Sequence, residues 1–187
     1  MARRGAPKLI WLLILAALAT ALLGTLGALA FIKSGLFNVG ASKPHTEFTQ
    51  WVTEEVMTHS IRNHAKHFDA PARFTAAQAA RGLCAYRSHC AACHGAAGVP
   101  RELWASGLEP KPPYLLDATH KWRPRELFWI AKNGIKMTGM PSWQDSLTDA
   151  EVWEVVAWLE ASRRLPPQTY VAWRSAGRCP TAQPFPG

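Results

Sequence analysis

The residues with the clearest chemistry in this chain lie in the stretch Cys90-Ala91-Ala92-Cys93-His94. This C-x-x-C-H spacing is the pattern for covalent attachment of a c-type haem. Two thiols on one turn of helix can add to the two vinyl groups of one porphyrin. The next residue, His94, then faces the iron, for which a neutral imidazole is a good axial ligand. The motif predicts one covalently bound haem c, held by Cys90 and Cys93.

Three other interpretations of the motif are a chance match, a thioredoxin-like redox pair and half of a zinc site. A zinc site would need two more ligands at similar short spacing, and the remaining cysteines, Cys84 and Cys179, do not form a second C-x-x-C pair. A redox pair normally follows a strand in a βαβ pattern, whereas the residues before Cys90 indicate a helix. Haem attachment is the interpretation that fits the surrounding sequence.

A second axial ligand must come from elsewhere in the chain. A methionine thioether is a soft ligand, and a His/Met pair raises the potential of a haem relative to two histidines. Met137 and Met140 follow the motif. We choose Met140, because Gly139 and Pro141 shape the backbone so that one side chain can be presented to iron, and we expect Met137 to pack. His120 is the main alternative for the second ligand. The other alternative is that both methionines lie in the core and the iron has no methionine ligand.

Helices must position these groups. The patterns predict helices over residues 75–86, from Pro124 to about residue 133, and over residues 148–162, where Thr148 and Glu151 form a capping box. Gly82 interrupts the first helix, and glycine costs about 1 kcal/mol there relative to alanine, so we expect another helix to approach it closely. Residues 95–113 hold three glycines and four prolines and predict a loop around one haem edge.

The N-terminal region predicts a membrane anchor. Leu9 to Ile32 is a run of 24 residues without charge, and a helix of that length, about 36 Å, can cross a hydrocarbon core of about 30 Å. The basic residues before the run place the amino terminus in the cytoplasm, and the remaining chain in the periplasm. A cleaved signal peptide is the competing interpretation, because Ala28-Leu29-Ala30 resembles a cleavage site, but the run is longer than a secretory apolar region.

Residues 46–66 predict an amphipathic helix, which would pack on the haem domain or on the membrane surface. The histidines in and just after it, His59, His64 and His67, lack an accompanying carboxylate or cysteine in a ligand pattern, so we interpret them as solvated or packing residues.

Charge argues against nucleic-acid binding. The chain carries a net charge of +8, but four of its 21 basic residues flank the apolar run, which leaves 17 basic and 13 acidic residues in the rest. Nucleic-acid binders usually cluster such residues on one face or stripe.

Four motifs in order resemble the membrane-anchored class I cytochromes c with one haem. They are the helix from Gly82 to Tyr86, the stretch from Cys90 to Gly95, the turn from Gly139 to Trp143, and a last helix with Val156-Ala157-Trp158-Leu159. The resemblance covers about residues 75–165 and implies an all-α fold.

The resemblance also implies roles for single residues. Gly82 and Tyr86 would meet Trp158 where the first and last helices cross. The carbonyl of Pro100 would orient the axial histidine, as a residue one step removed from the metal often does. Trp143 belongs to the residues expected to contact the haem.

The spare cysteines depart from this family. Cys84 stands where these proteins usually carry an aliphatic residue, and Cys179 lies beyond the matched region. Because an exported compartment permits disulfides, we expect these two cysteines to form one.

The chain therefore divides into an anchor at 1–33, a linker with an amphipathic helix at 34–74, an all-α class I cytochrome c-like haem domain at 75–165 and a Pro-rich tail at 166–187.

We expect an electron carrier without a small-molecule substrate. Its donor would be a quinol-oxidising complex or a periplasmic dehydrogenase, and its acceptor a terminal oxidase. Basic residues in the segments expected around the haem edge predict an acidic docking partner, although ordinary solvated charges would explain them equally well. These residues are Lys111, Lys121, Arg123, Lys132 and Lys136. A haem enzyme with an open sixth position and a subunit of a larger oxidoreductase remain alternatives.

Overall fold

The computed structural model describes residues 6–116, 118–164 and 166–175. The chain divides into two compact units, Met1–Lys43 and Pro44–Gly187. Within the described ranges the regular structure is helical, and one isolated antiparallel bridge joins Ala96 and Val99. The predicted all-α fold is confirmed.

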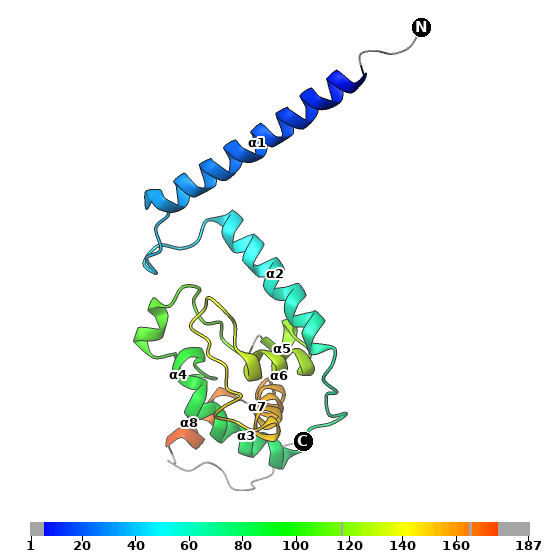
Figure 1. Ribbon diagram of the computed structural model, residues 1–187. Helices are drawn as coiled ribbons and strands as arrows, with labels where there is room; N and C mark the ends of the chain where they lie inside the picture. Colours follow the sequence, from blue (N-terminus) through cyan, green and yellow to red (C-terminus); the bar gives the residue numbers. More distant parts are fainter. Residues whose placement is uncertain (1–5, 117, 165, 176–187) are drawn as a thin grey trace. The chain divides into compact units, whose positions relative to one another are not determined.

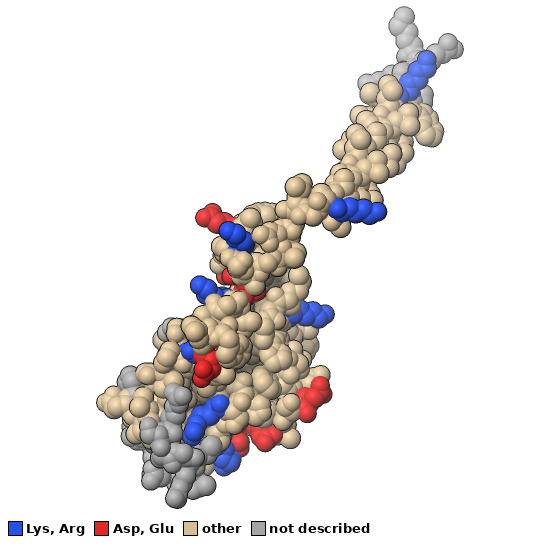
Figure 2. Space-filling view, turned by 90° about the vertical axis from the view of Figure 1, so that its left-hand side faces the viewer, with Lys and Arg blue, Asp and Glu red and all other residues tan. Residues whose placement is uncertain are grey.

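The first unit contains α1 (Ala6–Ser34). Its stretch Lys8–Ser34 is long and apolar enough to cross a membrane, with a mean hydropathy of 2.4. The side chains of Thr20 and Thr25 each donate a hydrogen bond of 2.9 Å to the carbonyl four residues earlier, so these hydroxyls are satisfied inside the helix, as a lipid environment requires. Figure 2 shows this helix uncharged between basic side chains near its two ends.

The second unit holds the remaining helices (Figure 1). In chain order they are α2 (Glu47–Ala65), α3 (Ala76–His89), α4 (Ala91–His94), the 3-10 helix η1 (Leu103–Gly107), α5 (Ala118–Lys121), α6 (Pro124–Asn133), α7 (Asp149–Ser162) and α8 (Pro167–Ser175).

The core of this unit is the crossing of α3 and α7. A methyl group added to Gly82 would lie 1.7 Å from the carbonyl oxygen of Glu154, so the two backbones touch at a distance that only glycine permits. One turn further along α3, the ring of Tyr86 lies 6.2 Å from that of Trp158, centroid to centroid, and both side chains are buried. The predicted crossing of the first and last helices is confirmed.

Local capping explains where the two crossing helices begin. Thr75 caps α3 and Thr148 caps α7, and each hydroxyl accepts a hydrogen bond from the backbone N–H three residues on. The side-chain oxygens of Gln78 and Glu151 each accept a hydrogen bond from the backbone N–H of the capping residue, which completes a capping box at each start. These starts match the predicted positions.

The α2 helix belongs to the same compact unit as the predicted haem domain. Ile61 and Ala65, in its C-terminal half, are buried, and Phe68 just beyond it lies 5.1 Å from Phe128 of α6, ring to ring. His64 stacks on Trp129 at 5.6 Å, a packing role of the kind predicted for the histidines of this region. In the structure the compact unit begins at Pro44, because α2 docks on α6, and the predicted division of the chain at residue 75 stays a prediction.

The C-terminal region has more structure than the sequence predicted. After α7 the chain forms α8, and Tyr170 of this helix is buried with its ring 5.9 Å from that of Trp158. Cys84 is disulfide-bonded, whereas Cys90 and Cys93 are free thiols. The predicted partner of Cys84, Cys179, lies outside the described residues.

Candidate haem site

The motif residues share one side of a single helical turn. Cys90 is the C-cap of α3 and the N-cap of α4, and its carbonyl accepts bonds from the N–H groups of Cys93 at 3.1 Å and His94 at 2.9 Å. Spacings of three and four residues place both thiols and the imidazole on neighbouring positions of the same face. Both thiols are free and half-buried, and burial raises the pKa of Cys90 to about 12.

The imidazole of His94, the candidate axial ligand, is buried and held in one orientation. Only 8% of His94 is exposed, and its Nδ1 lies 2.8 Å from the carbonyl oxygen of Pro113. A carbonyl only accepts, so Nδ1 carries the proton and Nε2 keeps its lone pair for a metal. Burial lowers the pKa of His94, which favours the neutral, ligating form.

The residue that orients His94 is not the predicted one. The resemblance assigned this role to Pro100, and that assignment is wrong, because the carbonyl at Nδ1 is that of Pro113. After His94 the chain makes a tight turn between Ala96 and Val99, which leaves Pro100 exposed, and only its later return brings Pro113 onto the ring.

Arg101 ties down the returning segment. Its guanidinium donates to the carbonyl of Pro112 and lies 4.4 Å from the ring centre of Tyr114. The roles of Arg101, Pro112 and Pro113 were not predicted from the sequence. The run Pro110-Lys111-Pro112-Pro113 was an available signal, because successive prolines keep a segment extended with its carbonyls free to accept.

Gly95 joins this loop to the helical core. It has a φ of 65°, and an added methyl would lie 2.9 Å from both Tyr114 Cε1 and the carbonyl oxygen of Val99. The buried hydroxyl of Tyr86 donates to the Gly95 carbonyl, so the helix crossing and the motif are directly connected. Burial raises the pKa of Tyr86 well above its usual range, so this hydroxyl keeps its proton.

Backbone and hydroxyl bonds close the loop that carries Met140. The N–H of Met140 donates to Thr138 Oγ1 at 3.1 Å, its carbonyl accepts from Ile135 at 3.2 Å, and Thr138 Oγ1 donates to the Ile135 carbonyl at 2.8 Å. Gly134, with a φ of 67°, ends α6 at a point where an added methyl would lie 2.5 Å from the carbonyl carbon of Pro141. These contacts fix the position of the Met140 backbone.

The two methionines of this loop differ sharply in exposure. Met137 is 97% exposed at a φ of 59°, so the expectation that it packs is wrong: the positive φ places it at the outer tip of the turn. Met140 is half-buried. Of the two, Met140 is the more buried, as the choice of ligand requires.

The Met140 loop meets both sides of the motif region. On one side, an added methyl at Gly139 would lie 3.0 Å from Leu108 Cδ1, just after η1. On the other, the half-buried Trp143 packs edge-on against His89 at 4.9 Å, next to Cys90. The structure thus brings Trp143 to the motif, and its predicted contact with the haem stays a prediction.

His120, the alternative ligand, lies in a different setting. It is exposed on α5, with Nδ1 3.4 Å from Arg163 Nη2, and lines a pocket of about 720 Å³ between α2, α5, α6 and α7. Five further cationic side chains and two carboxylates line this pocket: Arg62, Lys121, Arg123, Arg125 and Arg163, with Glu126 and Glu160.

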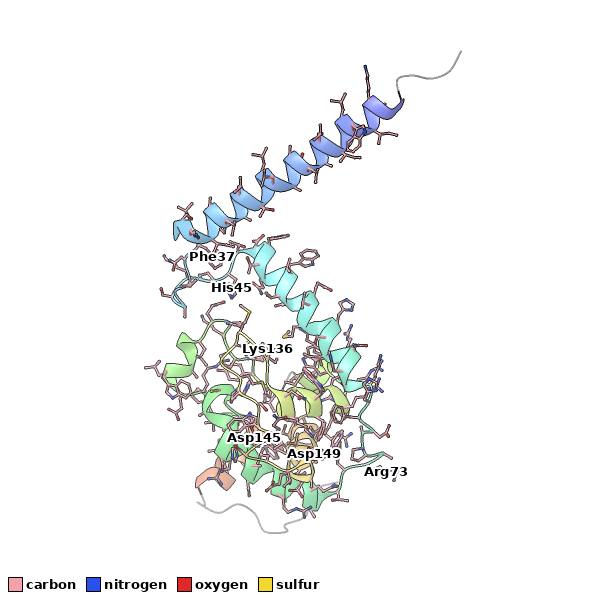
Figure 3. All side chains as sticks on the ribbon, viewed as in Figure 1. Phe37, His45, Arg73, Lys136, Asp145 and Asp149 are labelled. Carbon is pink, nitrogen blue, oxygen red and sulfur yellow. The ribbon has the colours of Figure 1, made fainter. Side chains whose placement is uncertain are left out.

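The basic residues predicted at the haem edge divide into two kinds. Lys111, Lys121, Arg123 and Lys136 are exposed. Lys132 is half-buried, and its Nζ lies 2.6 Å from Asp149 Oδ1, so its charge is already paired. Figure 3 labels Asp149, the partner of Lys132, and also the exposed Lys136 on the Met140 loop.

The residues of this site fit a covalently attached haem c. Two free thiols at the attachment spacing, a buried imidazole with Nε2 left available, and a thioether on a fixed loop make up the donor set that such a group needs. When bound, this group supplies a one-electron couple at its iron.

Residues 77–159 match the family model described as cytochrome C oxidase, cbb3-type, subunit III. No curated protein matches the chain. The matched range starts one residue into α3 and ends in α7, so it contains the motif, both loops and the helix crossing.

Proposed function

We propose that this chain, whose residues 77–159 form a domain of the c-type cytochrome family, carries single electrons between protein partners at the periplasmic face of a membrane, without transforming a substrate. One observation carries the proposal: the protein's own hydrogen bonds hold the His94 imidazole through Pro113 and the Met140 backbone through Thr138. With His94 and Met140 as the two axial ligands, little rearrangement would accompany a change of oxidation state, and a small molecule would have no open position to bind.

The anchor supports the membrane assignment. The α1 helix has the length and hydropathy of a membrane span, and the basic residues before it favour a cytoplasmic amino terminus. A carrier confined to the membrane plane meets membrane-bound partners at a raised effective concentration. Donors of the proposed kind are a quinol-oxidising complex or a periplasmic dehydrogenase, and a terminal oxidase is the proposed acceptor.

The ligand assignment is tested by comparing two methionine variants of the haem-loaded protein. We expect Met140→Ala to lose the methionine charge-transfer band of the oxidised form and to lower the midpoint potential, because a His/Met pair holds the potential high. Met137→Ala is the matched control, since that side chain is 97% exposed, and should leave both measurements unchanged. An unchanged spectrum in Met140→Ala would leave the sixth position to another group and would reopen the enzyme alternative.

Exposed cations support docking to an acidic partner. Lys121 and Arg123 lie in the cation-lined pocket, and Lys111 and Lys136 are exposed on the two loops that flank the motif. We expect the bimolecular rate of electron transfer to fall as ionic strength rises, and the double variant Lys121→Glu with Arg123→Glu to remove much of that dependence. The control is Lys66→Glu, an exposed lysine just after α2. A rate that does not respond to salt contradicts this docking mode.

A second candidate is a fixed haem c subunit of a larger oxidase. The description of the matched family, which names a subunit of a cbb3-type oxidase, favours it. Purification of the tagged chain from native membranes in mild detergent separates the two. A stoichiometric complex that survives high salt indicates a subunit, and recovery of the chain alone indicates a free carrier.

A further inference from the structure

The N-terminal half of α2 carries an apolar surface that the haem domain does not cover. Phe48 is 71% exposed, Trp51 60% and Val56 65%, and the rings of Phe48 and Trp51 lie 6.1 Å apart. With the half-buried Val52, these residues occupy an arc of about 140° at roughly 100° per residue. We call Phe48, Trp51, Val52 and Val56 the α2 apolar face.

This face is separate from the face that packs on the haem domain. Met57, Ile61 and Ala65 point into the core from the C-terminal half, and the centre of their arc lies about 150° around the helix from the α2 apolar face. On the core-facing side, the N-terminal half is polar: Gln50 donates to Glu54 at 3.2 Å, and both are exposed. The α2 apolar face therefore does not continue the core contact and needs another occupant.

The connection to α1 indicates what that occupant is. Only residues 35–46 separate the end of α1 at Ser34 from the start of α2 at Glu47, a reach of at most roughly 45 Å. This connection is itself apolar in part, with Leu36, Phe37 and Val39 exposed; Figure 3 labels Phe37 and His45 on it. Phenylalanine and tryptophan near the end of a membrane span are the residues that anchor chains at the lipid interface.

We propose that the α2 apolar face lies in the interfacial region of the same bilayer that α1 crosses, so that α2 sets the orientation of the haem domain on the membrane. The inference rests on the membrane anchor of the proposed function. The polar side of this half carries glutamine, threonine and glutamate rather than a row of lysines, so contact depends on apolar area and not on anionic lipid. Met57, Ile61 and Ala65 pack the same helix on the core that includes α6, so the orientation of α2 on the membrane would set that of the site.

The test uses the full haem-loaded chain in vesicles of neutral phosphatidylcholine. A spin label is attached to a single introduced cysteine in Trp51→Cys, in Phe48→Cys, which retains Trp51, or in the matched control Gln50→Cys on the polar side. The label's collision rate with oxygen, which concentrates in lipid, is divided by its rate with a water-soluble nickel chelate. The unmodified chain gives the labelling background, and an unchanged haem spectrum shows that each variant is folded.

We expect a higher oxygen-to-nickel ratio at positions 48 and 51 than at position 50. A fourth label, in Leu18→Cys within α1, separates the two proposals. If position 18 reports lipid while positions 48 and 51 resemble position 50, the interfacial role of α2 is overturned and the anchor stands. If position 18 reports water, the anchor itself fails and the inference fails with it.

Discussion

Replacing Gly82 with alanine tests the helix crossing on which the haem domain is built. An added methyl would lie 1.7 Å from the carbonyl oxygen and 2.3 Å from the carbonyl carbon of Glu154. Ordinary van der Waals contact begins at 3.4 Å, so the backbones of α3 and α7 must separate by about 1.7 Å. Because the obstacle is helix backbone, a change of side-chain rotamer cannot relieve the clash.

Two opposing contributions set the size of the effect. Overpacking a core costs about 1 to 3 kcal/mol, and we place a rigid backbone clash at or above the upper end of that range. Alanine recovers about 1 kcal/mol of helix propensity relative to glycine. The net loss is therefore about 2 kcal/mol or more in the free energy of unfolding. For a unit of this size it lowers Tm by roughly 4 to 8 °C.

Thermal unfolding of the haem-loaded protein, followed by circular dichroism, measures the change. Gly107→Ala is the matched control, because an added methyl there meets nothing within 4 Å, and its effect should stay within about 0.5 kcal/mol. If Gly82→Ala unfolds at the same temperature as Gly107→Ala, or at a higher one, then the close contact at α3 and α7 does not explain this glycine.

Two further predictions concern single hydrogen bonds. Tyr86→Phe removes the buried donor to the Gly95 carbonyl and should cost about 1 to 3 kcal/mol in chemical denaturation, whereas Tyr114→Phe, at a residue 46% exposed, should cost less; equal costs would contradict the role given to the buried bond. Thr148→Ala should cost about 1 kcal/mol at neutral pH. The backbone N–H of Thr148 and, to a smaller extent, its hydroxyl donate to the Glu151 carboxylate and lower the pKa of Glu151. The part of the stabilisation that depends on this carboxylate is present above the unfolded carboxyl pKa of about 4.3 and is lost as pH falls through the folded-state pKa. Alanine keeps the backbone donor but loses the hydroxyl, so the cost of Thr148→Ala in denaturation curves should be smaller at pH 3 than at pH 7, without vanishing, because the bond from the Glu151 N–H to the hydroxyl does not titrate.

Features decided by a few neighbouring residues could be predicted from the sequence. Thr75 and Thr148 were identified as helix starts because a capping residue bonds only three positions along the chain. The close approach at Gly82 was expected because a mid-helix glycine carries a cost that needs a packing reason. The attachment spacing of Cys90 and Cys93 is local in the same sense.

Features decided by how loops return could not be predicted. The Nδ1–H of His94 donates to the carbonyl of Pro113, which lies 19 residues further along the chain. The path of the loop between them depends on the hydrogen bond from Arg101 to Pro112, and the spacing of residues in the sequence does not predict that bond. The exposure of Met137 depends on a positive φ at the tip of the turn. The docking of α2 on α6 likewise depends on tertiary packing, and an amphipathic pattern alone left both the haem domain and the membrane as partners.

The order of the contacts explains how one crossing serves the whole site. Gly82 lets α7 approach α3, and this approach buries Tyr86 against Trp158. The Tyr86 hydroxyl then donates to the carbonyl of Gly95, the C-cap of α4. From Gly95, contacts continue to Tyr114, next to the Pro113 carbonyl that fixes the imidazole. The orientation of His94, the candidate axial ligand, is thus coupled to the packing of two helices. A substitution at Gly82 should disturb the midpoint potential as well as the stability, although residue 82 lies twelve positions before the histidine.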